Sequence, residues 1–245
     1  MSKMNASLWL NKLVCVLAFG LLASPVIAEQ TPERVQQGNL VMENIPEIRP
    51  AVRERLRQYQ NVRSASLSDF SPDGGIYILT RFGETSQIHH VAKPMGARRQ
   101  VTFYDERTSG ASVRPDHSGQ FMFSRDVGGD EFFQGFLFDP DTGTSIQFTE
   151  NQTRNQGFTW SPDGKQVAWS STTWEEPDYT IWAADPSAPE TRRKLIQAEG
   201  ATSPREWSPD GKTLLLGRYI SINETRLFLL DLESGEMEQI HPDRQ

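Results

Sequence analysis

A short turn sequence recurs four times in this 245-residue chain and constrains its fold more than any other feature. The four copies are Phe70-Ser71-Pro72-Asp73-Gly74, Val113-Arg114-Pro115-Asp116, Trp160-Ser161-Pro162-Asp163-Gly164 and Trp207-Ser208-Pro209-Asp210-Gly211. Successive prolines are separated by 43, 47 and 47 residues. A period of about 40 to 50 residues with four strands per unit is that of a β-propeller. The repeat therefore predicts an all-β propeller fold with four blades in this chain.

Each turn has a chemical reason to reverse the chain direction. Proline presets φ at the first central position, Asp can accept hydrogen bonds from the backbone two residues on, and Gly supplies φ > 0. We expect each turn to join the first and second strands of a blade, with two more strand-like segments following. The predicted second strands are 76–82, 120–125, 166–171 and 213–219; the third are 87–91, 135–139, 180–185 and 226–231; the fourth are 99–103, 145–149, 194–197 and 236–240.

The four blades are predicted at about 62–104, 105–150, 151–198 and 199–245. A polar lead-in segment, 29–61, precedes them. Within it Pro50 marks the start of a short helix, and Val52, Leu56 and Tyr59 share one helical face. The expected fold is therefore a short helix followed by propeller blades.

Residues 1–28 have the pattern of a secretory signal peptide. Lys3 and Lys12 precede an apolar run at 13–22, and Val26-Ile27-Ala28 precedes the expected cleavage point. That run is shorter than the roughly 20 residues that span a bilayer, which favours cleavage over membrane anchoring. We expect an exported protein, periplasmic or extracellular.

Composition excludes several classes of function. The only cysteine, Cys15, lies within the predicted signal peptide, so the mature chain is expected to have no disulfide and no thiolate chemistry. Loss of Lys3 and Lys12 with the signal peptide would change the formal net charge from −7 to −9. An acidic chain is poorly suited to neutralising phosphates, so no nucleic-acid partner is expected.

Motifs for catalysis are missing from the sequence. The segments Gly110-Ala111-Ser112 and Gly143-Thr144-Ser145 lack the second glycine of a hydrolase elbow, because Arg114 and Gln147 stand at that position. His89 and His90 are neighbours on a predicted strand, so they point to opposite faces and do not chelate one ion together. We expect no catalytic residue, no metal site and no cofactor in this chain.

Two acidic loops are the candidate contact sites. Both are predicted to connect the second and third strands of a blade, at one face of the propeller, where loops on a rigid scaffold can bind a ligand or a neighbouring domain. The alternative is that their charges are simply solvated. The candidate residues are Arg125, Asp126, Asp130 and Glu131 in the second blade, and Glu175 and Glu176 in the third.

The repeats, taken with three linking segments, resemble the amino-terminal propeller of bacterial serine peptidases of the prolyl oligopeptidase family. The segments are Arg81-Phe82-Gly83-Glu84-Thr85-Ser86-Gln87, Arg125-Asp126-Val127-Gly128-Gly129-Asp130-Glu131 and Tyr219-Ile220-Ser221-Ile222-Asn223-Glu224, and the resemblance runs from about Asn39 onward. The turn repeats alone are also found in the periplasmic TolB propeller, so the linking segments are the more specific signal.

The resemblance implies that substrate selection and catalysis belong to two different domains. In that family a propeller of usually seven or eight blades covers a carboxy-terminal α/β-hydrolase domain and screens which peptides reach its Ser-Asp-His triad. No triad residue maps onto this chain, which is expected to be inactive alone and to represent four blades of a larger, incomplete ring. A Glu pair binds the substrate amine in dipeptidyl peptidases, but Glu175-Glu176 lacks the helical context of that pair.

Two functions remain open from the sequence. The first is the substrate-gating propeller of an exported serine peptidase, whose partners would be the hydrolase domain and peptide substrates. The second is a non-catalytic, TolB-like periplasmic propeller that binds a protein or ligand. Four blades lie at the low end of the propeller range, and an unclosed array exposes sheet edges, which favours the first.

Overall fold

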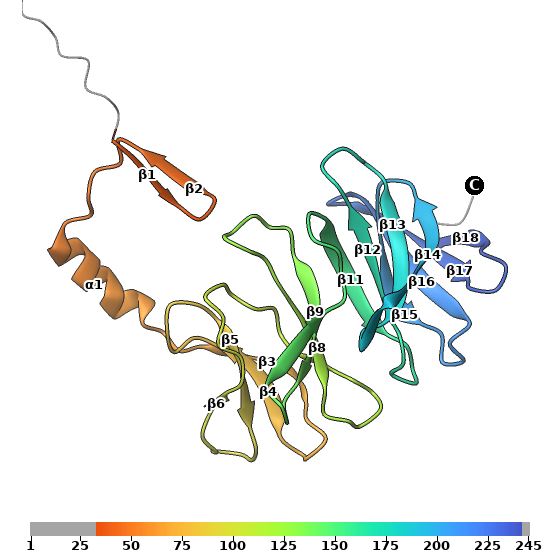
Figure 1. Ribbon diagram of the computed structural model, residues 1–245, viewed down its shortest axis with the longest axis horizontal. Coiled ribbons are helices and arrows are strands. Elements are labelled where there is room, and N and C mark those ends of the chain that lie inside the picture. Colours follow the sequence, from red (N-terminus) through yellow and green to blue (C-terminus); the bar gives the residue numbers. More distant parts are fainter. Residues whose placement is uncertain (1–32, 242–245) are drawn as a thin grey trace, which may run out of the picture. The chain divides into compact units, whose positions relative to one another are not determined.

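The computed structural model describes residues 33–241, and the predicted signal peptide lies outside this range. Within it, four four-stranded antiparallel sheets follow a two-stranded hairpin and one helix (Figure 1). The hairpin is β1 (Arg34–Gln37) and β2 (Leu40–Glu43), and the helix is α1 (Pro50–Gln60). No helix of the described range is long and apolar enough to cross a membrane.

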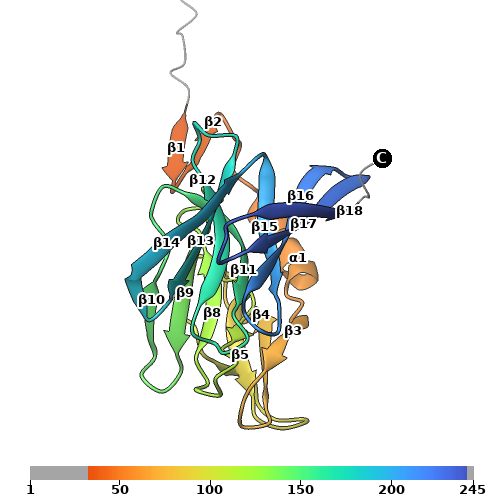
Figure 2. The ribbon, with the colours of Figure 1, turned by 90° about the vertical axis from the view of Figure 1, so that its right-hand side faces the viewer.

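Each sheet is one blade, built from consecutive strands that pair with their sequence neighbours. The first blade contains β3 (Ala65–Phe70), β4 (Ile76–Thr80), β5 (Gln87–Val91) and β6 (Arg99–Gln100), and the second contains β7 (Ser112–Val113), β8 (Phe121–Arg125), β9 (Gln134–Asp139) and β10 (Thr144–Gln147). The third contains β11 (Arg154–Trp160), β12 (Val167–Thr172), β13 (Tyr179–Asp185) and β14 (Ala188–Ala198), which run side by side in both views (Figure 2). The fourth contains β15 (Ala201–Trp207), β16 (Thr213–Ser221), β17 (Glu224–Asp231) and β18 (Met237–His241).

These sheets confirm the prediction of an all-β, incomplete propeller with a short helix before it. The second and third strands lie within two residues of their predicted bounds at each end, and the helix begins at Pro50 as predicted. The hairpin β1–β2 was not predicted, although its signal is present in the sequence. Gly38 has a φ of +58° at the first central position of a two-residue turn, where hairpins favour glycine.

The repeated turns owe their shape to one set of hydrogen bonds. In the third blade, Ser161 Oγ donates to Asp163 Oδ1 at 2.8 Å, and the Lys165 amide donates to the same oxygen at 3.1 Å. These two bonds hold the pKa of Asp163 below its usual value. Gly164 completes the turn with a φ of +70°. The Ser-to-Asp hydrogen bond recurs at Ser71–Asp73 and Ser208–Asp210.

Tryptophans at the ends of first strands connect one blade to the next. The Nε1 of Trp207 donates to the carbonyl of Thr159 at 3.2 Å, and the Nε1 of Trp160 donates to the carbonyl of Ser112 at 3.1 Å. Phe70 occupies the equivalent position of the first blade, where it has no ring N–H to donate. Its side chain is 68% exposed, because no described blade covers that face.

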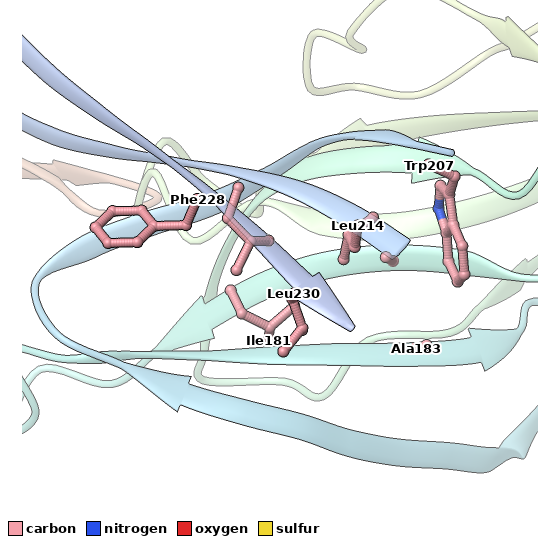
Figure 3. Close-up of a cluster of buried hydrophobic side chains, with 8 residues drawn as sticks. Ile181, Ala183, Trp207, Leu214, Phe228 and Leu230 are labelled. Carbon is pink, nitrogen blue, oxygen red and sulfur yellow. The ribbon is translucent and has the colours of Figure 1, made fainter. Parts of the chain in front are cut away.

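The apolar core lies between successive blades. Figure 3 shows the contact between the third and fourth blades, where Trp207 and Leu214 face the small side chain of Ala183. Ala168 and Ala183 of the third blade leave space for large side chains of the fourth, which lets the two sheets approach closely. The first and second blades bury an aromatic cluster that includes Phe121, Phe123 and Tyr77. Packing between blades therefore positions the loops at their ends.

Candidate functional site

A hollow of about 630 Å³ lies where the connections of the second and third blades meet. Its walls come from the β8–β9 loop, the β10–β11 connection and the β12–β13 loop. The rings of Phe132 and Trp174, from the first and last of these, lie 4.9 Å apart between centroids. The lining residues are Asp130, Phe132, Glu150, Asn151, Gln152, Thr153, Thr173, Trp174 and Glu175.

A smaller hollow of about 130 Å³ adjoins the first and shares Asp130, Phe132, Thr173 and Trp174 with it. Glu131 and Arg154 line only the smaller one. Three of the six predicted contact residues, Asp130, Glu131 and Glu175, therefore come together at one place although two different blades supply them. We define these two hollows together as the loop-face hollow.

The β8–β9 loop is held in shape by its own acidic residues. Asp126 is only 6% exposed, and its Oδ2 accepts the Glu131 amide at 3.1 Å. Asp130 Oδ1 accepts the Phe132 amide at 2.9 Å, which directs the Phe132 ring toward Trp174. Glu131 has a φ of +59°, a conformation that non-glycine residues seldom adopt. Asp126 thus acts inside the loop and does not line the hollow.

The tip of the β1–β2 hairpin also supports this loop. The Asn39 backbone N–H donates to the Gly128 carbonyl at 3.3 Å, and its side-chain Nδ2 donates to the Val127 carbonyl at 3.2 Å. Gly38 lies so close that a Cβ there would be 3.3 Å from the Gly128 oxygen. A segment from before the propeller therefore braces one wall of the loop-face hollow.

Arg125 points away from the hollow, into the seam between the first and second blades. Its guanidinium pairs with Glu106 at 3.3 Å and lies 4.7 Å from the Tyr104 ring centroid. Arg218 is placed similarly in the fourth blade: it pairs with Glu199 at 2.8 Å and lies 4.6 Å from the ring centroid of Phe228, as Arg125 lies 4.8 Å from that of Phe136. Because the arrangement recurs at the same sequence spacing of 19 residues, it fastens the second and the fourth blade to the segments that lead into them.

Glu176 also does not line the hollow. Its backbone carbonyl accepts the Thr172 hydroxyl at 2.6 Å, a bond that closes the base of the β12–β13 loop. Beside it, Trp174 is 85% exposed, which is unusual for so large an apolar side chain. The β12–β13 loop therefore presents an indole ring and the carboxylate of Glu175 to the hollow.

Negative charge dominates the lining. Asp130, Glu131, Glu150 and Glu175 contribute four carboxylates, against the single guanidinium of Arg154. Glu150 is in addition paired with Arg192, which lies outside the lining. Carboxylates beside exposed aromatic faces attract cations, by charge and by cation–π contact. This arrangement is suited to holding a positively charged group.

The predicted geometry of the two histidines is observed. His89 Nδ1 lies 3.0 Å from the Gln87 carbonyl, whereas His90 Nε2 lies 3.2 Å from the Ser71 hydroxyl, on the other face of β5. Neither lines the loop-face hollow. In the described range, no three His, Cys, Asp or Glu side chains are grouped so that they could hold a metal ion.

The sequence interpretation missed Phe132, Glu150 and the bracing residue Asn39. Glu150 could have been found from propeller topology. The connection that leads into a blade emerges on the same face as the loop between that blade's second and third strands, so 148–153 must lie near 173–178. Nothing in the sequence shows that the hairpin tip contacts the β8–β9 loop.

Comparison with known proteins supports the fold. No protein-family profile matches the sequence, and no curated protein matches it either. One similar solved structure is a prolyl endopeptidase, with 14% identity and a TM-score of 0.54 over 86% of this chain and 39% of that one. Another is an oligogalacturonate lyase in complex with manganese, with 16% identity and a TM-score of 0.53 over 67% of this chain and 42% of that one. A putative TolB from Agrobacterium tumefaciens is also similar, with 22% identity and a TM-score of 0.51 over 69% of this chain and 62% of that one. The chain thus spans between 39% and 62% of the lengths of these proteins, and at such identities the likeness establishes the propeller fold.

Proposed function

We propose that this chain is the substrate-gating propeller region of an exported serine peptidase of the prolyl oligopeptidase family. The observation that carries the proposal is the location of the three peptidase-like segments. They include the β4–β5, β8–β9 and β16–β17 connections with adjoining strand residues, and these are the same connection in three different blades. In a propeller these connections emerge on one face, where they can meet a second domain and its substrates.

In this proposal the chain's residues select substrates and do not perform the bond cleavage. The nucleophile and its histidine would belong to the α/β-hydrolase domain. The propeller face would supply the loop-face hollow, whose carboxylates and aromatic rings hold a cationic group of an approaching peptide. Phe132 and Trp174 would contact the apolar part of that group, while Asp130 and Glu175 would face its charge.

Activity labelling of the protein as cells make it tests the proposal. An antibody raised against the propeller would be used to precipitate the natural gene product from the exported fraction, and the precipitate would be treated with a fluorophosphonate probe for active serines. We expect a labelled band well above the 27.7 kDa of this chain. An unlabelled band at or below that mass, purified together with a stable protein partner, would instead support the TolB-like binding function.

The loop-face hollow is tested separately in that enzyme. Trp174→Ala should lower kcat/KM by about two- to fivefold for peptides with a basic residue, because an exposed cation–π contact is worth roughly 0.5–1 kcal/mol. Glu175→Gln should have a similar effect, because an exposed ion pair is worth up to about 1 kcal/mol. Uncharged peptides should be cleaved as before. The control Glu233→Gln removes an exposed acid that does not line the hollow. Equal losses in the control, or for uncharged peptides, would contradict a role in selection.

A further inference from the structure

A second hollow, of about 530 Å³, lies between α1 and the β4–β5 loop and has the opposite charge. Arg53 and Arg57 enter it from the helix, and Arg81 enters it from the loop. Glu84 is the only acidic side chain among the lining residues that the structure describes. The apolar part of the wall consists of Ile48, Leu56 and Phe82. We call this the arginine hollow.

Two of the three guanidinium groups have no hydrogen-bond or ion-pair partner in the described part of the chain. Arg53 and Arg57 make no side-chain hydrogen bond or ion pair within residues 33–241. They are four residues apart on one helical face, where like charges repel and weaken the helix. Arg81, in contrast, is tied to α1 because its guanidinium donates to the Gln60 carbonyl. The helix and the loop are therefore fastened at one end of the hollow, with two free cations beside the bond.

The charge balance favours an anion in this hollow. Three guanidinium groups against the one carboxylate of Glu84 leave a net charge of about +2. The carboxyl end of α1 contributes roughly half a negative charge from the helix dipole, which is too little to cancel this. A guanidinium fork matches carboxylate geometry and can form two parallel hydrogen bonds with it.

The apolar wall narrows the class of anion. Leu56 and Phe82 lie in the same lining as the arginines, so a ligand that fills the hollow carries an apolar group next to its charge. Inorganic phosphate has no such group. A lipid surface would meet the adjoining hollow of α1, which shares Leu56 with the arginine hollow and is also lined by Val52, Tyr59 and Arg55. A volume of about 530 Å³ is also within the usual range for small-ligand pockets.

We propose that the arginine hollow binds an acidic peptide segment, with an Asp or Glu carboxylate held by Arg53 and Arg57 and an adjacent apolar side chain against Leu56 and Phe82. This proposal does not depend on the peptidase function. It gives the helix before the propeller a binding role, on residues that the sequence interpretation treated only as a lead-in.

Fluorescence anisotropy on the full chain tests this proposal. The probe is a labelled peptide with the core Glu-Leu-Glu-Phe, compared with the analogue Gln-Leu-Gln-Phe. We expect saturable binding of the acidic probe only, weakening as salt screens the exposed charges. Arg53→Gln and Arg57→Gln should each weaken it about two- to fivefold, as expected for ion pairs at exposed side chains. The control Arg55→Gln removes the same charge from the same helix but outside the hollow, and should leave binding unchanged.

Several results would overturn the proposal. Equal weakening in Arg55→Gln would mean that only the overall charge of the helix matters. Binding of both probes alike would remove the role of the carboxylate. If the peptide fails to bind and inorganic phosphate binds instead, the arginines would be assigned to phosphate. If the peptide fails to bind and the chain binds phosphatidylglycerol vesicles, with that binding lost in Arg55→Gln, the helix would be assigned to a lipid surface. Circular dichroism of each variant confirms that α1 is still formed.

Discussion

Replacing Trp207 tests whether contacts between blades hold the propeller together. Its indole is only 7% exposed, packs against the third blade and donates to Thr159. Burial of about 200 Å² of an aromatic side chain at roughly 25 cal/mol per Å² contributes about 5 kcal/mol. Measured losses for Trp→Ala in protein cores are about 3–5 kcal/mol, so we expect Trp207→Ala to cost about 4 kcal/mol.

Urea unfolding followed by circular dichroism measures this cost. With a slope of about 2.5 kcal/mol per molar urea, the midpoint should fall by about 1.6 M. Trp207→Phe keeps most of the apolar area but leaves the Thr159 carbonyl without its donor, and should cost about 1–3 kcal/mol. Phe70→Ala is the matched control, since Phe70 has the same position in the repeat but is 68% exposed. We expect it to cost less than about 0.5 kcal/mol.

The reasoning is refuted if Phe70→Ala destabilises the chain as much as Trp207→Ala does. That result would mean that the face of the first blade on which Phe70 is exposed is covered in solution. A small loss for Trp207→Ala would refute it in a different way, because it would show that blades three and four fold without their shared core.

Two further predictions concern the turns. Gly164→Ala should cost about 2–3 kcal/mol, because residue 164 has a φ of +70° and the new Cβ would also lie 3.1 Å from the Asp116 backbone nitrogen. The control Gly143→Ala has the same φ but nothing within 4 Å of the new Cβ, and should cost about 1 kcal/mol. Equal costs in urea unfolding would show that the contact with Asp116 contributes nothing. Asp163 has a lowered pKa in the folded state, so its stabilising effect is present above its unfolded value and is lost as pH falls through the folded value. Asp163→Asn should therefore make stability less dependent on pH in the acid range, and an unchanged acid unfolding curve would contradict this.

Most of the fold could be predicted because the turn chemistry repeats. Ser161, Asp163 and Gly164 each have one role in the turn, and the same roles recur with a nearly constant spacing. The second blade shows what happens when the pattern changes. Arg114 replaces the serine there, and its Nε reaches across to the Gly164 carbonyl at 2.8 Å. That bond joins the turns of two blades, and the residues on either side of Arg114 do not predict it.

The candidate site was less predictable because local charge does not reveal the direction of a side chain. Arg125 and Asp126 stand beside Asp130 in the sequence, but Arg125 lies in a seam between blades and Asp126 is buried within its loop. The recurring spacing of the pairs Glu106–Arg125 and Glu199–Arg218 is the one sequence signal that could have marked Arg125 as structural. Side chains that lack such a recurring partner, such as Trp174, are the better candidates for binding.

The division between core and loops explains why the fold alone does not identify the function. The contacts that hold the blades together use residues on strands, such as Trp207 and Leu214, whereas both hollows are lined chiefly by the connections and the helix before the blades. Substitutions in those connections leave the core intact, so one scaffold can serve a peptidase, a lyase and TolB. In this chain the connections form one acidic and one basic hollow.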